Sequence, residues 1–229
     1  MDNPHAMTYL DHLGEFAMRY VRAGQTLGLG TGRAAAAFIR ALGRSGIKVR
    51  GVPTSNASAE LAESLGIELV ELRDVHRIDI DFDGADEVDP RLNLIKGNGG
   101  ALVREKIVAA ASRRRIILVG DEKLVKRLGA HGNLPVEVVP FAEAYVARRI
   151  RALGMKPKLR LDGAGGDFIT DNHNIILDCG VKEIRHPARL EEELLNIPGV
   201  VGTGLFVGVA TTVLVASQDG KVTTLRPKS

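Results

Sequence analysis

One stretch decides the fold of this chain and the place of its chemistry, residues 78–110: IDIDFDGADEVDPRLNLIKGNGGALVREKIVAA. It opens with alternating apolar and polar residues over 78–82, the pattern of a buried strand. Asp83 and Asp86 follow directly and therefore lie at the carboxyl end of that strand. Because ligands of open α/β sheets bind at the carboxyl ends of the strands, the pattern predicts a ligand site around these two carboxylates.

A lysine and a glycine-rich bend come next, and they add the other charged groups of the predicted site. Lys96 is followed by the bend 97–100, GNGG, and a helix is predicted over 101–111 with Glu105 in its early part. Three carboxylates and one ammonium thus gather around a strand end, a glycine bend and a helix N-terminus. The candidate catalytic residues are Asp83, Asp86, Lys96 and Glu105.

A second glycine loop lies near the start of the chain. A short strand over 26–30 runs into Gly30, Thr31 and Gly32, and the alanine-rich segment 33–42 is predicted to form a helix. This order places backbone N–H groups and a helix N-terminus together, which is an arrangement that binds anions.

Three interpretations of this loop compete. Gly30, Gly32 and Ala35 fit the G-x-G-x-x-A pattern of a dinucleotide site. Such a site also needs an acidic residue at the end of the next strand, but the predicted strand 47–52 is followed by Pro-Thr-Ser. A single phosphate is therefore the favoured ligand, and tight packing of helix on strand with no ligand remains the alternative.

Strands and helices alternate through the first half of the chain, which predicts a doubly wound, mostly parallel, Rossmann-like α/β sheet. The predicted helices here cover 10–21, 33–42, 56–65 and 101–111, and the predicted strands cover 26–30, 47–52, 67–72, 78–82 and 116–120. We expect residues 1–132 plus 203–229 to form this catalytic domain, with 202–225 returning to strand.

The rhythm changes after Gly132, where strands outnumber helices and the turns are short. We therefore expect residues 133–202 to form a smaller, inserted α+β (ferredoxin-like) subdomain. Its predicted elements are strands over 135–139, 158–161, 167–170 and 174–178, a hairpin turn at 171–173, and helices over 142–153 and 187–195.

The bulk composition argues against two kinds of partner. The chain has 229 residues and a formal net charge of +3, which does not suggest a nucleic-acid footprint. The arginine run 113–115 is best explained as a solvated helix end before a strand at 116–119. Residues 200–217 are uncharged, but Gly and Thr break them into two short strand-like pieces, so buried sheet is expected there instead of a membrane span.

Cysteine and histidine usage indicates the compartment and the cofactor class. The single cysteine, Cys179, excludes an internal disulfide and is compatible with a reducing cytosol. Residues 1–13 show no basic and then apolar leader, so the expected location is cytoplasmic. No metal is predicted, because four of the histidines are scattered without ligand spacing: His76, His131, His173 and His186.

Taken together, the motifs of this chain resemble those of the type A ribose-5-phosphate isomerase family, in order and over nearly the whole length. The matching segments are GLGTG at 28–32, GVPTS at 51–55, DFDGADE at 81–87, KGNGGALVREK at 96–106, a strand ending in Asp121 and Lys123, PVEVVPFA at 135–142, TDNHNIILD at 170–178 and IPGVVGTGLF at 197–206. The resemblance implies interconversion of ribose 5-phosphate and ribulose 5-phosphate in the non-oxidative pentose phosphate pathway, without a cofactor.

The resemblance also implies roles for the candidate residues. Glu105 would be the general base that moves a proton between C2 and C1 through a cis-enediolate, and Asp83 would assist ring opening. Asp86 and Lys96 would handle the hydroxyl protons and the negative charge that develops on oxygen. The substrate-binding candidates are Gly30, Thr31, Gly32, Arg33, Gly97, Gly99 and Lys123.

The candidate residues are also of the types that this reaction requires. Aldose–ketose isomerisation needs one base that reaches two adjacent carbons, and a carboxylate does so with little motion. The enediolate oxygen needs cationic or N–H partners, which Lys96 and the amides of the bend 97–100 can supply. A phosphate anchored away from the reacting carbons lends its binding energy to their orientation.

The phosphate loop departs from the pattern of the family. Arg33 and Ala34 stand where the family has Ser and Thr, and the lysine expected near Leu10 and Asp11 is absent. We expect Arg33 to supply the missing phosphate cation.

Three departures lie outside the phosphate loop. Asn98 replaces a loop glycine and is expected to be tolerated because Asn adopts positive φ. The turn 121–123 is one residue short, which affects the placement of Lys123, and His173 replaces a turn glycine.

Other classes of function remain as alternatives. A sugar-phosphate sensor would bind the ligand without turnover, but such sensors usually carry a DNA-binding head, and only one helix is predicted before Thr26. An acyl-CoA transferase needs a nucleophilic carboxylate with room for CoA, and a sugar-phosphate deaminase normally uses a histidine relay; neither signature is evident. The resemblance further implies a homodimer or homotetramer, with the strand-rich insertion as the interface.

Overall fold

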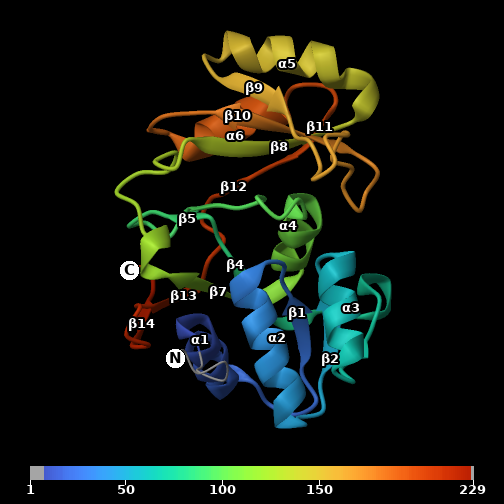
Figure 1. Cartoon of the computed structure of the whole chain (residues 1–229), viewed down its shortest axis with the longest axis vertical. Coiled ribbons are helices and arrows are strands. Elements are labelled where there is room, and N and C mark those ends of the chain that lie inside the picture. Colours follow the sequence, from blue (N-terminus) through green and yellow to red (C-terminus); the bar gives the residue numbers. More distant parts are fainter. Residues whose placement is uncertain (1–7, 228–229) are drawn as a thin grey trace. The chain divides into compact units, whose positions relative to one another are not determined.

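The structure, a computed structural model, describes residues 8–227. Residues 1–7, which belong to the segment 1–13 where no leader is expected, lie outside the described residues. The chain forms two compact units (Figure 1). The first unit comprises Met1–Gly84, Ile107–Lys123 and Val209–Ser229, and the second comprises Ala85–Lys106 and Leu124–Gly208. The predicted division at 133–202 stays a prediction; the structure groups 85–106, 124–132 and 203–208 with the second unit as well.

The first unit is built on a seven-stranded sheet in the order β14-β13-β7-β4-β1-β2-β3. Its pairs are parallel except for the edge strand β14, as the alternation of strands and helices predicts. The strands are β1 (Thr26–Leu29), β2 (Arg50–Pro53), β3 (Glu68–Leu69), β4 (Ile78–Gly84), β7 (Ser112–Gly120), β13 (Thr212–Ala216) and β14 (Val222–Leu225).

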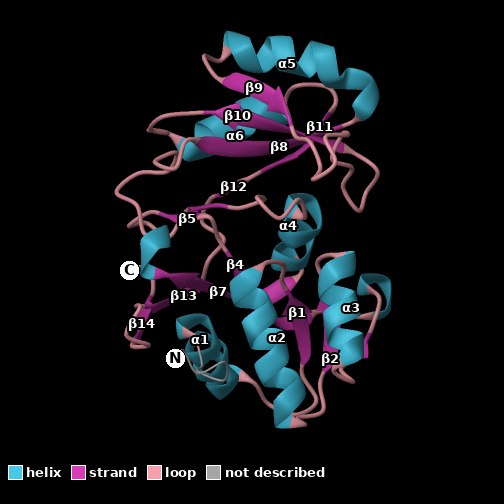
Figure 2. Cartoon of the chain, in the orientation of Figure 1, coloured by secondary structure: helices cyan, strands magenta, loops and turns pink. Residues whose placement is uncertain are grey.

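The N-terminal helices lie on one face of this sheet (Figures 1 and 2). Their apolar side chains pack against it. Phe38 stacks on Phe82 of β4 with ring centroids 4.0 Å apart, and both rings are fully buried. Burying side chains of this size contributes about 1.5–3 kcal/mol each, which fixes the strand that ends in Asp83. The helices of this unit are α1 (Tyr9–Ala17), α2 (Arg33–Ser45) and α3 (Asn56–Ser64), with 3₁₀ turns at Met18–Tyr20, Leu72–Asp74 and Asp121–Lys123.

The other face of the sheet meets helix α4 (Leu102–Ala110), at a point where only glycine fits. A Cβ on Gly28 would lie 2.7 Å from Val108 Cγ1 and 2.6 Å from Asp81 Oδ1. The glycine therefore lets the helix approach β1 closely. Helix α4 belongs to both units, because Leu102–Lys106 falls in the second and Ile107–Ala110 in the first.

The second unit holds a four-stranded antiparallel sheet in the order β11-β8-β10-β9. Its elements follow the chain as β8 (Asn133–Val138), α5 (Glu143–Ala152), β9 (Lys156–Leu159), β10 (Ile175–Gly180), α6 (Pro187–Leu195) and β11 (Val200–Thr203). This βαββαβ order with antiparallel pairing is the predicted ferredoxin-like arrangement. A separate three-stranded sheet contains β5 (Glu87–Val88), β6 (Leu94–Ile95) and β12 (Leu205–Phe206).

Three local predictions were wrong. The segment 167–170 forms isolated bridges at Asp167 and Ile169 instead of the expected strand. The arginine run 113–115 lies inside β7, which starts at Ser112, and does not form a helix end. Pairing with β4 explains this, because Arg114 and Arg115 lie opposite Ile80 and Asp81 in the parallel ladder. The side chains are also held, since Arg115 donates to the carbonyls of Ser112 and Val209 and Arg114 lies over the ring of Tyr20. Residues 200–217 form three strands, β11, β12 and β13, where two were expected.

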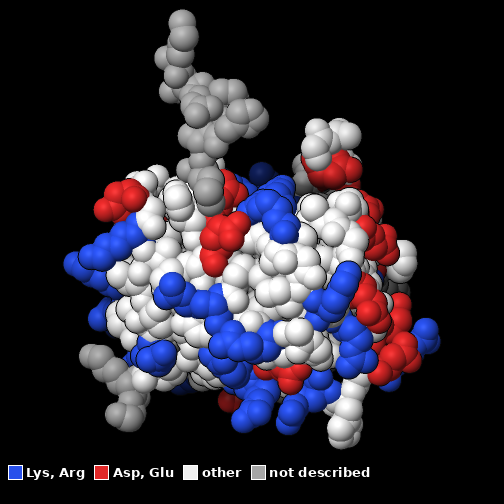
Figure 3. Space-filling view, turned by 90° about the horizontal axis from the view of Figure 1, so that it is seen from below, with Lys and Arg blue, Asp and Glu red and all other residues white. Residues whose placement is uncertain are grey.

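The surface carries charges of both signs, as its small net charge suggests. On the face seen in Figure 3, Lys and Arg side chains are interspersed with uncharged surface and with Asp and Glu. Within the part of the chain that the structure describes, no helix has the length and apolarity to cross a membrane.

Candidate active site

The predicted phosphate loop, residues 28–32, connects β1 to α2 in the first unit, and it requires glycine at positions 30 and 32 as well as at Gly28. A Cβ on Gly30 would lie 2.2 Å from Asp83 Oδ1, so no other residue fits beside that carboxylate. Gly32 has φ 100°, which side chains rarely adopt, and it is the N-cap residue of α2 without a side-chain cap. The first amides of the thirteen-residue helix α2 therefore have no side-chain acceptor from their N-cap residue.

Asp83 holds this loop in place. Its Oδ1 accepts hydrogen bonds from the backbone N–H of Thr31 at 3.1 Å and of Gly84 at 2.7 Å, and the side chain is buried. The hydroxyl of Thr31 lies 2.8 Å from that of Thr54 and donates to Ser55 Oγ at 2.8 Å. The structure therefore brings two predicted site residues, Thr31 and Asp83, into direct contact.

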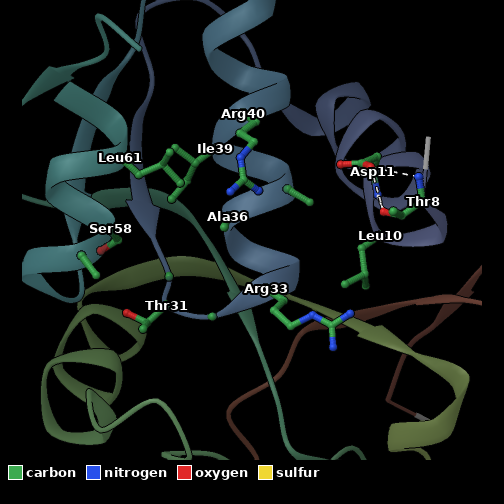
Figure 4. A pocket seen from close by; sticks show the side chains of 14 residues that line it. Thr8, Leu10, Asp11, Thr31, Arg33, Ala36, Ile39, Arg40, Ser58 and Leu61 are labelled. Carbon is green, nitrogen blue, oxygen red and sulfur yellow. Dashed lines mark hydrogen bonds between the residues drawn. The ribbon is translucent and has the colours of Figure 1, made fainter. Parts of the chain in front are cut away.

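A pocket of about 500 Å³ opens beside the phosphate loop (Figure 4). Its wall includes Gly30, Thr31 and Gly32 from the loop and the side chains of Arg33 and Arg40 from one face of α2. Opposite them, Thr8, Leu10 and Asp11 come from the start of α1, and Ala57, Ser58 and Leu61 from α3. Arg33 lies at the N-terminus of α2, which lacks a side-chain cap, and Arg40 lies two turns further along the same face; together they make this pocket suited to a phosphate.

The second unit holds the pair of Lys96 and Glu105. Lys96 Nζ lies 3.3 Å from Glu105 Oε2, and both side chains are only 4 % exposed. A buried carboxylate next to a buried ammonium has both a proton acceptor and a stabiliser of negative charge within one small volume. The prediction that these two residues lie together is confirmed by this distance.

Short strands position Lys96. It directly follows β6, whose Ile95 and Leu94 pair with Leu205 and Phe206 of β12. The backbone N–H of Lys96 donates to the carbonyl of Gly204 at 2.9 Å, and a Cβ on Gly204 would lie 2.4 Å from the carbonyl oxygen of Lys96. Close approach of the two backbones thus fixes where the lysine side chain begins.

The glycine bend, residues 97–100, is shaped by two positive φ angles, 106° at Gly97 and 84° at Gly100. Asn98 does not have a positive φ, so the reason expected for its tolerance was wrong. Its backbone N–H instead donates to Asp86 Oδ2 at 3.0 Å, an interaction that any residue can make. Asp86 therefore faces the bend, and Gly99 lies exposed within it.

Arg160 braces the glycine bend and gave no signal in the sequence. Its Nη1 donates to the carbonyls of Gly97 at 2.9 Å and Asn98 at 3.1 Å, and its other nitrogens bind both carboxylate oxygens of Asp178. Burial raises the pKa of Asp178, but the hydrogen bonds of Arg160 and Asn133 outweigh it, so the pKa lies below its usual range.

The predicted site residues are divided between the two units. The first unit contains Gly30, Thr31, Gly32, Arg33, Asp83 and Lys123, and the second contains Asp86, Lys96, Gly97, Gly99 and Glu105. Lys123 is partly buried and is the last residue of the shortened 3₁₀ turn, which directly follows Gly120 at the end of β7. Arg40 was not predicted, because an arginine on a helix face carries no motif; its spacing of two turns from Arg33 was the available signal.

Cys179 and His173, which were also considered in the sequence, have surroundings that explain them without a role in the site. Burial raises the pKa of the Cys179 thiol to about 12, which keeps it protonated. His173 is exposed with φ 61° in its turn, consistent with its replacing glycine there. Among residues 8–227, no group of three or more His, Cys, Asp or Glu side chains is arranged to hold a metal ion.

A Rossmann-like sheet with a glycine loop and a helix N-terminus at a strand end, together with a buried carboxylate–lysine pair in the second unit, is typical of an α/β enzyme whose ligand binds at the carboxyl ends of the strands. A family model for ribose 5-phosphate isomerase A (phosphoriboisomerase A) matches residues 50–220. The chain belongs to this family.

Relatives and solved structures agree with this assignment. The ribose-5-phosphate isomerase A of Roseiflexus sp. is 46% identical over 93% of this chain and 94% of its own. That of Gloeobacter violaceus is 50% identical over 89% and 90%. The structure from Methanocaldococcus jannaschii has a TM-score of 0.90 at 41% identity, covering 95% of this chain and 98% of that one.

One solved structure also carries a ligand. A D-ribose-5-phosphate isomerase in complex with phospho-erythronic acid has a TM-score of 0.92 at 37% identity, covering 96% of this chain and 100% of that chain. The match extends through both units, and the alternative of a non-catalytic sugar-phosphate sensor is not favoured.

Proposed function

We propose that this protein interconverts D-ribose 5-phosphate and D-ribulose 5-phosphate through a cis-enediolate, without a cofactor. Membership of the family, over nearly the whole chain, supports the reaction. The observation that carries the mechanism is the buried pair of Lys96 and Glu105, 3.3 Å apart.

Glu105 acts as the general base in this proposal. With the sugar chain open, its carboxylate takes the proton from C2 of the aldose and returns it to C1, and the reverse reaction uses the same two steps. Lys96 stabilises the negative charge on the enediolate oxygen and exchanges protons with the hydroxyl groups. Such proton transfer by a positioned side chain contributes roughly 10²- to 10⁴-fold to the rate.

Asp83 and Asp86 serve the earlier and later proton transfers. Asp83 assists ring opening, and Asp86 handles a substrate hydroxyl beside the amides of Gly97 and Gly99. Two residues, Gly84 and Ala85, separate the two aspartates in the sequence. Lys123 closes over the bound sugar phosphate.

The phosphate binds at the phosphate loop. The hydroxyl of Thr31 and the amides around Gly30 and Gly32 contact its oxygens, and Arg33 supplies the cation. A hydrogen bond to a charged group contributes about 1.5–3 kcal/mol. We expect Arg33→Ala to raise the KM for ribose 5-phosphate roughly 10- to 150-fold with a smaller change in kcat. An unchanged KM would rule out this role.

The decisive experiment is turnover of ribose 5-phosphate by the purified protein beside Glu105→Gln. We expect kcat to fall roughly 10²- to 10⁴-fold in the variant, with binding of the substrate retained. Glu193→Gln makes the same chemical change on the exposed face of α6 and should leave kcat unaltered. A parent that binds ribose 5-phosphate but does not turn it over would contradict the proposal.

We also propose a cytoplasmic homodimer or homotetramer that associates through the second unit. Val139, Phe141 and Tyr145 lie within seven residues and are 40%, 100% and 38% exposed, an apolar group that a second copy would cover. Light scattering after gel filtration measures the assembly. Phe141→Asp should shift it toward the monomer, and an unchanged mass would exclude this surface.

A further inference from the structure

Lys106, the residue after the proposed general base, is held by contacts that the proposed reaction does not use. Its ammonium donates to the carbonyl of Leu205 at 2.6 Å and forms an ion pair with Glu191 of α6. It also lies 3.5 Å from the hydroxyl of Thr203. Burial lowers the pKa of this lysine and Glu191 raises it, with burial the larger effect.

These contacts close a ring around the catalytic pair. Lys106 ties the first turns of α4 to β12, through the carbonyl of Leu205. Leu205 pairs with Ile95 of β6, and Lys96 follows Ile95 directly. Glu105, the neighbour of Lys106 on α4, completes the ring because its carboxylate forms an ion pair with Lys96 at 3.3 Å. Every link is a hydrogen bond, an ion pair or a peptide bond, so the ring leaves little freedom to the distance between the two reactive side chains.

The phenyl group of Phe206 lies close to both lysines of this ring of contacts. The ammonium of Lys106 lies 4.8 Å from the centroid of its ring, and that of Lys96 lies 5.5 Å from it. The phenyl group is 1 % exposed. Two cations near one aromatic ring are each attracted to it while they repel each other. The phenyl group therefore keeps both ammonium groups near β12, where Lys96 pairs with Glu105 and Lys106 pairs with Glu191.

We propose that Lys106, held by Glu191 and the Leu205 carbonyl, is a positioning residue that sets the separation of Glu105 and Lys96. This inference rests on the proposed isomerase function and assigns to that site a third charged residue and its partner on α6. Lys106 does not touch the substrate in this account. Its removal lets the first turn of α4 move relative to β6, and the carboxylate then meets C1 and C2 in a poorer geometry.

Kinetics of Lys106→Met and Glu191→Gln test the proposal. A misplacement of about 1 Å costs roughly a hundredfold in rate, so a shift of part of that distance should lower kcat on the order of 10-fold in Lys106→Met. KM should stay within about 2-fold, because the phosphate loop is untouched. Glu191→Gln keeps an acceptor oxygen and should lower kcat less, on the order of 3-fold.

The isotope effect separates positioning from loss of folded protein. With ribose 5-phosphate deuterated at C2, slower proton transfer raises the deuterium isotope effect on kcat in both variants. A smaller fraction of correctly folded enzyme would lower kcat and leave the isotope effect of the parent unchanged. If Lys106→Met does not fold, Glu191→Gln carries the test on its own.

The same helix supplies matched controls. Arg189 and Glu193 form an ion pair of 2.8 Å on α6 with side chains 77% and 37% exposed, so Arg189→Met and Glu193→Gln repeat both changes away from the ring. Variants of Lys106 and Glu191 that match these controls in kcat and isotope effect would overturn the inference while the isomerase function stands. A parent without turnover would overturn both.

Discussion

Breaking the pair of Lys96 and Glu105 should destabilise the protein far more than breaking an ion pair on its surface. The two charges lie 3.3 Å apart and are each 4 % exposed. Their attraction is roughly 5 kcal/mol at an effective dielectric constant of about 20. Most of it offsets the loss of hydration, so the net value of the pair is small, but removal of one partner leaves a buried charge and costs about 3–5 kcal/mol.

We therefore expect Glu105→Gln and Lys96→Met each to lose about 3–5 kcal/mol of unfolding free energy. For a chain of this size, each kcal/mol corresponds to roughly 2–4 °C, so the melting temperature should fall by roughly 6–20 °C. The double variant Lys96→Met/Glu105→Leu has no buried charge at this position. It should recover most of the loss in stability while it stays inactive.

Thermal and urea unfolding of the parent and the three variants measure these differences in stability. Arg127 and Glu183 form the control, since they lie 2.7 Å apart with side chains 56% and 59% exposed. Removing Arg127 should cost less than about 1 kcal/mol. The reasoning fails if either single variant of the buried pair is as mild as this control, or if the double variant is less stable than both single ones.

Three further outcomes follow from contacts described above. Gly30→Ala should abolish most turnover and lower stability, because its Cβ would lie 2.2 Å from Asp83 Oδ1; a fully active variant would contradict the packing. The lowered pKa of Asp178 stabilises the folded state at pH above the unfolded-state pKa of about 3.9, and this stabilisation is lost as the pH falls through the folded-state pKa. Arg160→Met should therefore lower the free energy of unfolding more at pH 7 than at about pH 3, as measured by urea unfolding. Cys179, with a pKa of about 12, should not react with a thiol reagent in the native protein at about pH 8; fast labelling would show that the thiol is accessible.

The sequence predicted those parts of the fold that depend on neighbouring residues. The alternation over 78–82 and the helical segment 101–111 placed Asp83 at a strand end and Glu105 near the start of a helix, as the structure has them. The arginine run 113–115 was placed wrongly because local charge favours a helix end, whereas pairing with β4 extends β7 through it.

The contacts that the sequence did not predict are long-range. Arg160 reaches the glycine bend from β9's end, and Lys106 reaches Glu191 on α6; neither pair is marked by spacing or composition. Their partners are decided by how β10 and α6 pack, and a single sequence does not carry that information. The positive φ expected at Asn98 was wrong for a similar reason, since Gly97 and Gly100 already make the turn.

The order of segments in the first unit has a consequence for how the protein is made. Strand β13 pairs with β7, yet the chain between them builds most of the second unit. During synthesis, β7 therefore has a neighbour on one side only until Val209–Ser229 has left the ribosome. Contacts of such high sequence separation fold slowly, and the second half of β7 is apolar and buried. A chain cut before Thr212 would present this strand as an open edge that pairs with other copies and aggregates.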